Sequence, residues 1–236
     1  MRTSKLMSTV AVSAVLLLAG CGGTSVAAAS SAAPSSNGVA DLTADQILAT
    51  TTEAAKAQSS VHVAGKGTSG GQAIALDVHL RKGGGGYGTI TLGANTLQIV
   101  STGTQVYFKG DKAFWTSTAN AKAAELIGDR WLKAPSSNAS FASLAELADF
   151  DAGLTQFLKP DGAITRGDVG TASGQKAIAL VSTSGKLRVA TTGDPLPIRI
   201  DTGTAGESLD FTHWGADVSI PVPADKDTID LSALGG

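Results

Sequence analysis

Histidine is the side chain that most often performs acid–base chemistry or binds metals near neutral pH. The chain of 236 residues has 3 of them, His62, His79 and His213, and they lie far apart in the sequence. They fall into neither an HxH nor an HExxH spacing. We therefore expect each histidine to lie on the surface or at the rim of a strand. A Ser–His–Asp triad formed by residues distant in sequence is the alternative. The sequence predicts no catalytic residue and no metal site.

Two glycine-rich segments match the phosphate-binding pattern GxGxxG, at Gly65 to Gly70 and at Gly83 to Gly88. Phosphate binding requires such a loop to open a helix within a βαβ unit. Both matches lie between alternating, strand-like patterns, so we expect them to be hairpin turns. Gly170 to Lys176 resembles a Walker A loop, but it has one residue too few before the lysine and no Ser or Thr after it. No cofactor is expected.

The single cysteine, Cys21, directly follows Leu18-Ala19-Gly20 at the end of an apolar N-terminal segment. Arg2 and Lys5 precede the apolar run from Val10 to Leu18, an order that is typical of a secretory signal peptide. The run is about half of the ~20 residues that a bilayer-spanning helix needs. The residues around Cys21 look like a bacterial lipobox, in which a diacylglyceryl group alkylates the thiol before cleavage. A cleaved signal with a chance cysteine is the alternative.

This interpretation predicts how the chain is organised. Residues 1–20 would be a lipoprotein signal peptide, residues 21–40 a flexible tether and residues 41–236 a single folded domain. The tether is expected because Gly22 to Gly38 has no charge and almost no bulky apolar side chain. Palmitate or similar acyl chains on Cys21 would anchor the protein in membrane lipid, on the extracytoplasmic face of the cell membrane.

The composition excludes several classes of protein. With 42% hydrophobic and 16% charged residues, the chain is too apolar to be disordered, and 29 Gly with only 7 Pro favour many short strands and turns. The 18 basic and 20 acidic residues give a net charge of −2, so we expect no nucleic-acid partner. One cysteine allows neither an intramolecular disulfide nor a cysteine-based zinc site.

A helix is predicted over residues 44–58, because Thr43 and Gln46 form a capping-box pattern before residues of helical spacing. From Ser60 the apolar period changes to two, which indicates half-buried strands. Between two such blocks, we expect a helix from Thr118 to Ile127, a strand at Arg130 to Lys133, and one or two short helices that end at Pro160. Because the turns between strands are short, the strands should be antiparallel.

Short segments of both blocks carry a family resemblance. They are Ser60-Val61-His62-Val63, Val106-Tyr107-Phe108-Lys109-Gly110, Gly128-Asp129-Arg130-Trp131-Leu132-Lys133, Asp194-Pro195-Leu196-Pro197-Ile198-Arg199-Ile200 and Phe211-Thr212-His213-Trp214-Gly215-Ala216. Together with the lipobox, the polar tether and the N-terminal helix, they resemble the LppX/LprG-type bacterial lipoproteins. That family is similar to the LolA/LolB lipid carriers and is chiefly found in the actinobacterial envelope.

The resemblance implies an α+β fold that is mainly β: a strongly curved antiparallel sheet, a LolA-like half-barrel, packed on its concave side by a few short helices. An apolar cavity between sheet and helices would hold acyl chains. The apolar members of the alternating strands would line it: Ile74, Leu76, Val78, Leu80, Ile90, Leu92, Leu97, Ile99, Val106, Phe108, Ile178, Leu180, Ile198, Ile200, Leu209 and Phe211.

These observations favour a membrane-anchored, non-enzymatic lipoprotein that binds lipid or lipoglycan acyl chains and transports or presents them. The alternative is an envelope adaptor with a filled core whose surface binds another protein. A continuous apolar void would favour the carrier, and a filled core would favour the adaptor. The sequence identifies neither the lipid nor any protein partner.

Overall fold

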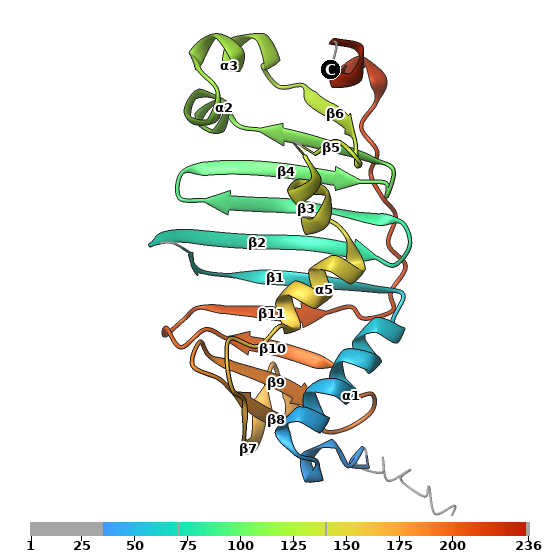
Figure 1. Ribbon diagram of the computed structural model, residues 1–236, viewed down its shortest axis with the longest axis vertical. Coiled ribbons are helices and arrows are strands. Elements are labelled where there is room, and N and C mark those ends of the chain that lie inside the picture. Colours follow the sequence, from blue (N-terminus) through green and yellow to red (C-terminus); the bar gives the residue numbers. More distant parts are fainter. Residues whose placement is uncertain (1–34, 70, 140, 235–236) are drawn as a thin grey trace, which may run out of the picture. The chain divides into compact units, whose positions relative to one another are not determined.

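Antiparallel hairpins build one large, open and curved sheet of 12 strands (Figure 1). The computed structural model describes residues 35–69, 71–139 and 141–234; the predicted signal peptide and Cys21 lie outside these residues. The predicted class, α+β and mainly β with a curved sheet, is confirmed. The strands are β1 (Ser60–Ser69), β2 (Gln72–Arg81), β3 (Gly85–Leu92), β4 (Asn95–Ser101), β5 (Gln105–Gly110), β6 (Trp131–Pro135), β7 (Thr165–Ala172), β8 (Gln175–Val181), β9 (Lys186–Ala190), β10 (Pro197–Asp201), β11 (Ser208–Thr212) and β12 (Thr228–Asp230).

Two blocks of consecutive strands make up this sheet, in the order β12-β6-β5-β4-β3-β2-β1-β11-β10-β9-β8-β7. The blocks meet where β1 pairs with β11, with His62 opposite Thr212 and Val63 opposite Phe211. Every pairing between named strands is antiparallel except that of β12 with β6, at one edge of the sheet. The two strand blocks are therefore halves of one sheet.

Five short helices accompany the sheet: α1 (Ala44–Ala57), α2 (Lys112–Thr118), α3 (Ala121–Ile127), α4 (Ala142–Leu147) and α5 (Phe150–Leu158). Single-turn 3-10 helices are η1 (Val39–Asp41), η2 (Asp225–Asp227) and η3 (Leu231–Leu234). The helix predicted over 44–58 is confirmed, and its N-terminus has the predicted capping box between Thr43 and Gln46. Within the described ranges, no helix has the length and apolar character needed to cross a bilayer.

The region between the strand blocks differs from the prediction at one helix. A helix was expected from Thr118 to Ile127, but α3 begins at Ala121 because the Asn120 side chain accepts a hydrogen bond from the Ala123 N–H at 2.9 Å. A separate helix, α2, precedes it and begins after Asp111, whose carboxylate accepts a hydrogen bond from the Phe114 N–H. Both caps are side chains that satisfy the free N–H groups of a first turn.

Helices α1, α4 and α5 pack on one side of the sheet, which we call the helix face (Figure 1). Phe150 and Leu154 of α5 are at most 1% exposed and pack against Val78 and Leu80 of β2. Ile47 of α1 packs in the same way on β8 and β9. Each such fully buried apolar side chain contributes about 1.5–3 kcal/mol to the free energy of unfolding.

The folded region begins earlier than the composition predicts. Residues up to 40 were expected to be tether, yet Ser36 forms a bridge with Thr192, and the Asn37 side chain donates hydrogen bonds to Ala190 O and Gly193 O, both at 3.0 Å. Val39 is 2% exposed. The backbone of Ser36, the amide of Asn37 and the side chain of Val39 supply these contacts, and a composition dominated by Gly, Ser and Ala does not reveal them.

After β11, which lies in the middle of the sheet, the chain runs along the ends of the strands. It reaches the edge of the sheet at which β12 pairs with β6 (Figure 1). On the way, Arg81 donates a hydrogen bond to Val218 O at 3.2 Å. At the edge, Lys133 Nζ lies 2.7 Å from Asp230 Oδ2. The sequence did not predict β12 because three residues are too few to show an alternation.

The Lys133–Asp230 pair yields a prediction about pH. Hydrogen bonds from Lys133 and Ser232 lower the Asp230 pKa from 3.8 to about 2. Because the pKa is lower in the folded state, this carboxylate stabilises the edge above pH 3.8, and its contribution is lost as the pH falls toward 2. A Lys133→Met variant should raise the Asp230 pKa toward 3.8 in a carbon-detected NMR titration. An unchanged titration would show that the lysine does not hold this edge.

Candidate functional site

The helix face of β2 is only half covered. Ile74, Leu76, Val78 and Leu80 share this face by strand alternation. Val78 and Leu80 are fully buried, whereas Ile74 and Leu76 remain half-buried. The difference arises because α5 packs on the Val78 and Leu80 end of the strand. The other end, near the turn to β1, carries apolar side chains without a complete cover.

An apolar groove of about 300 Å³ lies at this uncovered end. Strands β11, β1, β2 and β3 form its floor, and one residue each from α4 and α5 forms its helical side. Its lining consists of Gly65, Lys66, Gly67, Thr68, Ile74, Leu76, Ile90, Leu92, Leu147, Phe157, Thr202 and Leu209. Most of the side chains in this lining are aliphatic or aromatic.

Two glycines of β1 keep the groove wide because they place no side chain in it. Gly65 lies opposite Leu76, and Gly67 lies opposite Ile74, so both occupy positions on the helix face. A Cβ atom at Gly65 would lie 1.9 Å from Ser208 O, so the close approach of β11 requires glycine there. At Gly67 the nearest atom to such a Cβ is 3.7 Å away. Gly67 is therefore a position where a larger side chain could enter the groove.

The groove has exposed leucines at its rim. Leu92 of β3 is 41% exposed and Leu147 of α4 is 40% exposed. Large apolar side chains that gather at a concave surface, rather than being scattered singly, mark sites of ligand or partner binding. Leu92 and Leu147 therefore extend the apolar surface from the groove to the solvent.

A second, smaller pocket of about 130 Å³ adjoins the end of α5. Its apolar lining includes Leu48, Phe157, Leu158, Leu180, Leu187 and Ile200. Phe157 belongs to the lining of both spaces, and its ring meets that of Phe211 edge-on at 6.0 Å. Phe157 therefore borders both the groove and the second pocket.

The structure divides the residues that were expected to line a cavity. Ile74, Leu76, Ile90, Leu92 and Leu209 line the apolar groove. Leu180 and Ile200 line the second pocket. The following residues lie in filled core clusters and line neither space: Val78, Leu80, Leu97, Ile99, Val106, Phe108, Ile178 and Phe211. The helices fill the middle of the space between the layers, so the open volume lies at one end.

Ile198 requires a correction. Alternation predicts that it shares a face with Ile200, but the register shifts between Pro197 and Arg199. Ile198 packs instead with Ala172, Ala177 and Ala190. Ala177 directly precedes Ile178, which belongs to the cluster under α1, so neighbouring strand residues point to opposite faces. A β-bulge moves a side chain in this way because it adds one unpaired residue to a strand.

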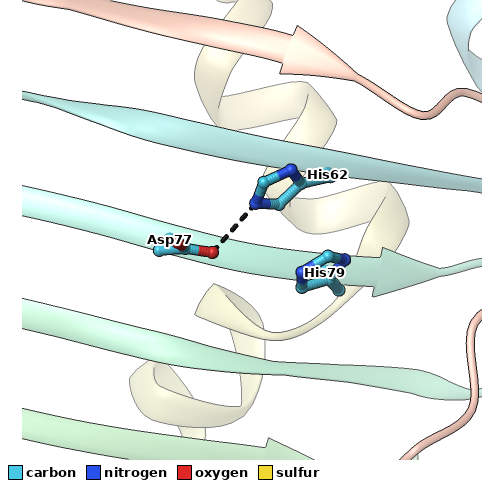
Figure 2. Close-up of side chains that lie close together, drawn as sticks. All are labelled: His62, Asp77 and His79. Atoms are coloured by element: carbon cyan, nitrogen blue, oxygen red, sulfur yellow. Dashed lines mark hydrogen bonds and ion pairs between the residues drawn. The ribbon is translucent and has the colours of Figure 1, made fainter.

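The opposite face of β1 and β2 carries a cluster of titratable side chains, which we call the histidine cluster: His62, Asp77, His79 and His213. Figure 2 shows how His62, Asp77 and His79 lie together on adjacent strands. The rings of His62 and His79 stack with their centroids 4.1 Å apart and an interplanar angle of 8°. His62 Nε2 lies 2.9 Å from Asp77 Oδ1, and His62 Nδ1 lies 3.1 Å from the Thr212 hydroxyl.

His213 joins the cluster from the residue after β11. Its ring centroid lies 5.7 Å from that of His62. Partial burial and the nearby His62 lower the pKa of His79, Asp77 opposes this effect, and His213 lowers the pKa further. The hydroxyl beside His62 belongs to Thr212 and not to a serine. The contacts of His62 therefore do not form a Ser–His–Asp triad.

Sequence reasoning treated the three histidines separately and missed this cluster. One available signal was the Gly70-Gly71 turn. A two-residue hairpin loop at these positions sets residues 69 and 72 opposite each other, and counting back along both strands sets His62 opposite His79. The approach of His213 depends on the pairing of β1 with β11, for which no local signal exists.

Comparison with models of known protein families finds no match, and no curated protein matches the chain.

Neighbouring positions on β2 should respond very differently to the same large side chain. Val78→Trp would overpack a filled core, at a cost of about 1–3 kcal/mol or more. That cost lowers the melting temperature by roughly 2–12 °C in a domain of this size. Leu76→Trp should change it little, because the ring can enter the groove. Thermal melts of both variants measure this difference, and equal losses would show that the groove is filled in solution.

Proposed function

We propose that the apolar groove binds an acyl chain of a lipid. The observation that carries this proposal is the groove itself, which is lined mainly by aliphatic and aromatic side chains and has exposed leucines at its rim. Its volume of about 300 Å³ lies at the lower end of the range of ligand pockets. This volume suits part of one acyl chain better than a whole lipid with two chains.

Binding would be driven by desolvation, with no bond made or broken. Each methylene that moves from water into the groove gains about 0.8 kcal/mol. The polar part of the lipid would remain outside the groove, on the side of Thr202. In this proposal the protein carries or presents lipid and is not an enzyme.

The anchor belongs to the same proposal. Acylation of Cys21 would hold the groove close to membrane lipid on the extracytoplasmic face, which suits a protein that collects or delivers acyl chains. We also infer that the curved sheet with helices on one side is of the LppX/LprG and LolA kind. What supports this inference is the set of sequence segments that resemble the family, together with a single curved sheet.

The adaptor remains the second candidate, and one observation favours it. The middle of the space between sheet and helices is filled, with Val78, Leu80 and Leu154 fully buried. On this interpretation Leu92 and Leu147 would contact a protein rather than a lipid. A test for acyl chains in the groove separates the two candidates.

Gly67→Leu provides that test, because it adds a side chain to the groove at a position with room for it. If it displaces two methylenes of a ligand, about 1.6 kcal/mol is lost, which weakens binding somewhat more than tenfold. The probe is cis-parinaric acid, an 18-carbon fluorescent fatty acid, titrated into the purified protein. The control is Ala75→Leu, which adds the same side chain to the opposite face of the neighbouring strand.

Wild-type protein and Ala75→Leu should bind the fatty acid equally, and Gly67→Leu should bind it more weakly with no loss of melting temperature. A wild-type protein that does not bind the probe, or a Gly67→Leu variant that binds it fully, would favour the adaptor.

A separate prediction concerns the anchor. Cys21→Ser removes the thiol that would be acylated, so the variant should leave the membrane fraction of the producing bacterium. Fractionation after a high-salt wash measures this, because salt removes proteins held by surface charge alone. Variant protein that remains with the membranes would contradict anchoring through Cys21.

A further inference from the structure

All 3 histidines of the chain meet at one place on the sheet. In the sequence, His79 lies 17 positions after His62, and His213 lies 134 positions after His79. They come from β1, from β2 and from the residue after β11. The apolar groove lies on the other face of the same strands, so it does not explain this gathering.

We propose that His62, Asp77 and His79 form a binding site for a divalent transition-metal ion, with Zn²⁺ as the best match and with His213 as a further ligand. Two or three imidazoles and one carboxylate are a common donor set for Zn²⁺. Ca²⁺ and Mg²⁺ prefer sets made of oxygen atoms, so the imidazoles select against them.

The donor atoms are already close together. One ligand atom from each of His62, Asp77 and His79 can be chosen so that all lie within 4.8 Å of one another. In a tetrahedral site with bonds of about 2.0–2.2 Å, neighbouring donor atoms are roughly 3.3–3.6 Å apart. The widest pair of donor atoms therefore has to close by at most about 1.5 Å, whereas His62 Nε2 and Asp77 Oδ1, which are 2.9 Å apart, have to separate slightly. His62 and His79 are half-buried and Asp77 is exposed, so side-chain rotations can supply this movement.

Strand geometry fixes where these side chains start. His62 and His79 are directly opposite residues of an antiparallel pair, and Asp77 precedes His79 by one strand period on the same face. The Cβ atoms of such residues are held in place by the hydrogen bonds of the sheet. A site built on paired strands is for this reason better preorganised than a site on loops.

The hydrogen bonds of His62 resemble those of a metal ligand. Its Nδ1 atom lies 3.1 Å from the Thr212 hydroxyl, which orients the ring and leaves Nε2 directed at Asp77. A metal-bound histidine usually has such a partner on its other nitrogen. In the metal-bound form Nδ1 would carry the proton and donate it to the Thr212 hydroxyl, and Nε2 would bind the ion beside the Asp77 carboxylate.

Metal binding would have to open the stack of His62 and His79. A metal ion lies in the plane of each imidazole that binds it, and two parallel rings 4.1 Å apart cannot both contain it in their planes. The stack is therefore the metal-free arrangement, and the His79 ring must turn when an ion binds. This rotation is a specific consequence of the proposal that can be observed.

The backbone at His213 supports a role for its side chain. In a regular strand, His213 would point away from the face on which Thr212 lies. Its φ of 52° is in the left-handed region instead, and its ring lies beside His62. This conformation is sterically unfavourable for an L-residue, and such strain is often found at functional sites.

The test is titration of ZnCl₂ into the purified, chelator-treated protein by calorimetry, prepared without a histidine tag. We expect one Zn²⁺ per chain, and at least tenfold weaker binding in His62→Gln, in His79→Gln and in Asp77→Asn. Asp129→Asn removes an exposed carboxylate outside the cluster and should bind Zn²⁺ as the wild type does. Fatty-acid binding should be unchanged in all these variants, which keeps this test independent of the proposed function.

NMR of the wild-type imidazoles decides the question even if a variant fails to fold. Zn²⁺ should shift the ring signals of His62 and His79 and remove the contacts between their stacked rings. It should also raise the melting temperature, because an ion that binds only the folded state stabilises it. Three results would each overturn the proposal: no saturable binding at one equivalent of Zn²⁺, variants of His62, His79 and Asp77 that bind Zn²⁺ as tightly as the wild type, or a stack of His62 and His79 that stays intact when Zn²⁺ is present.

Discussion

The pairing of β1 with β11 is the contact on which both sites depend. It joins two blocks of hairpins that are otherwise separate in the chain and sets Gly65 opposite Leu209 and His62 opposite Thr212. The first of these pairs lies in the floor of the apolar groove, and the second orients a histidine of the cluster. Without this pairing, β1 would be an open edge, the groove would lose one wall, and His213 would be far from His62.

Alternation along β1 and β2 then separates the two sites. Leu76 points into the groove, while Asp77, its neighbour in the chain, lies on the face of the histidines. A strand places successive side chains on opposite faces, so two chemically different surfaces can be built from one hairpin with no shared side chains. The same geometry makes the register strict, because a slip by one residue would place charged groups under α5 and expose the core.

The sequence predicts what is local and misses what is not. The capping box of Thr43 and Gln46 predicts α1, and alternation places Leu76 and Val78 on one face. It does not show that α5 covers Val78 and leaves Leu76 half-buried, because coverage depends on where a helix from another part of the chain packs. The bulge at Ile198 reverses its face without any Gly to mark it. The cross-strand pair of histidines could have been predicted from the Gly70-Gly71 turn, but the approach of His213 could not.

The distance in sequence between the paired strands also affects when the sites form. His62 and Thr212 are separated by 150 positions. Contacts between residues this far apart form slowly, because the entropy of closing a long loop must be overcome before the contact stabilises anything. The hairpin of β1 and β2 is local and can form first, and it already carries Leu76, His62, Asp77 and His79. The pairing of β11 with β1 then adds Leu209 to the groove and brings His213 to His62, so neither the groove nor the full histidine cluster is complete before these two strands pair.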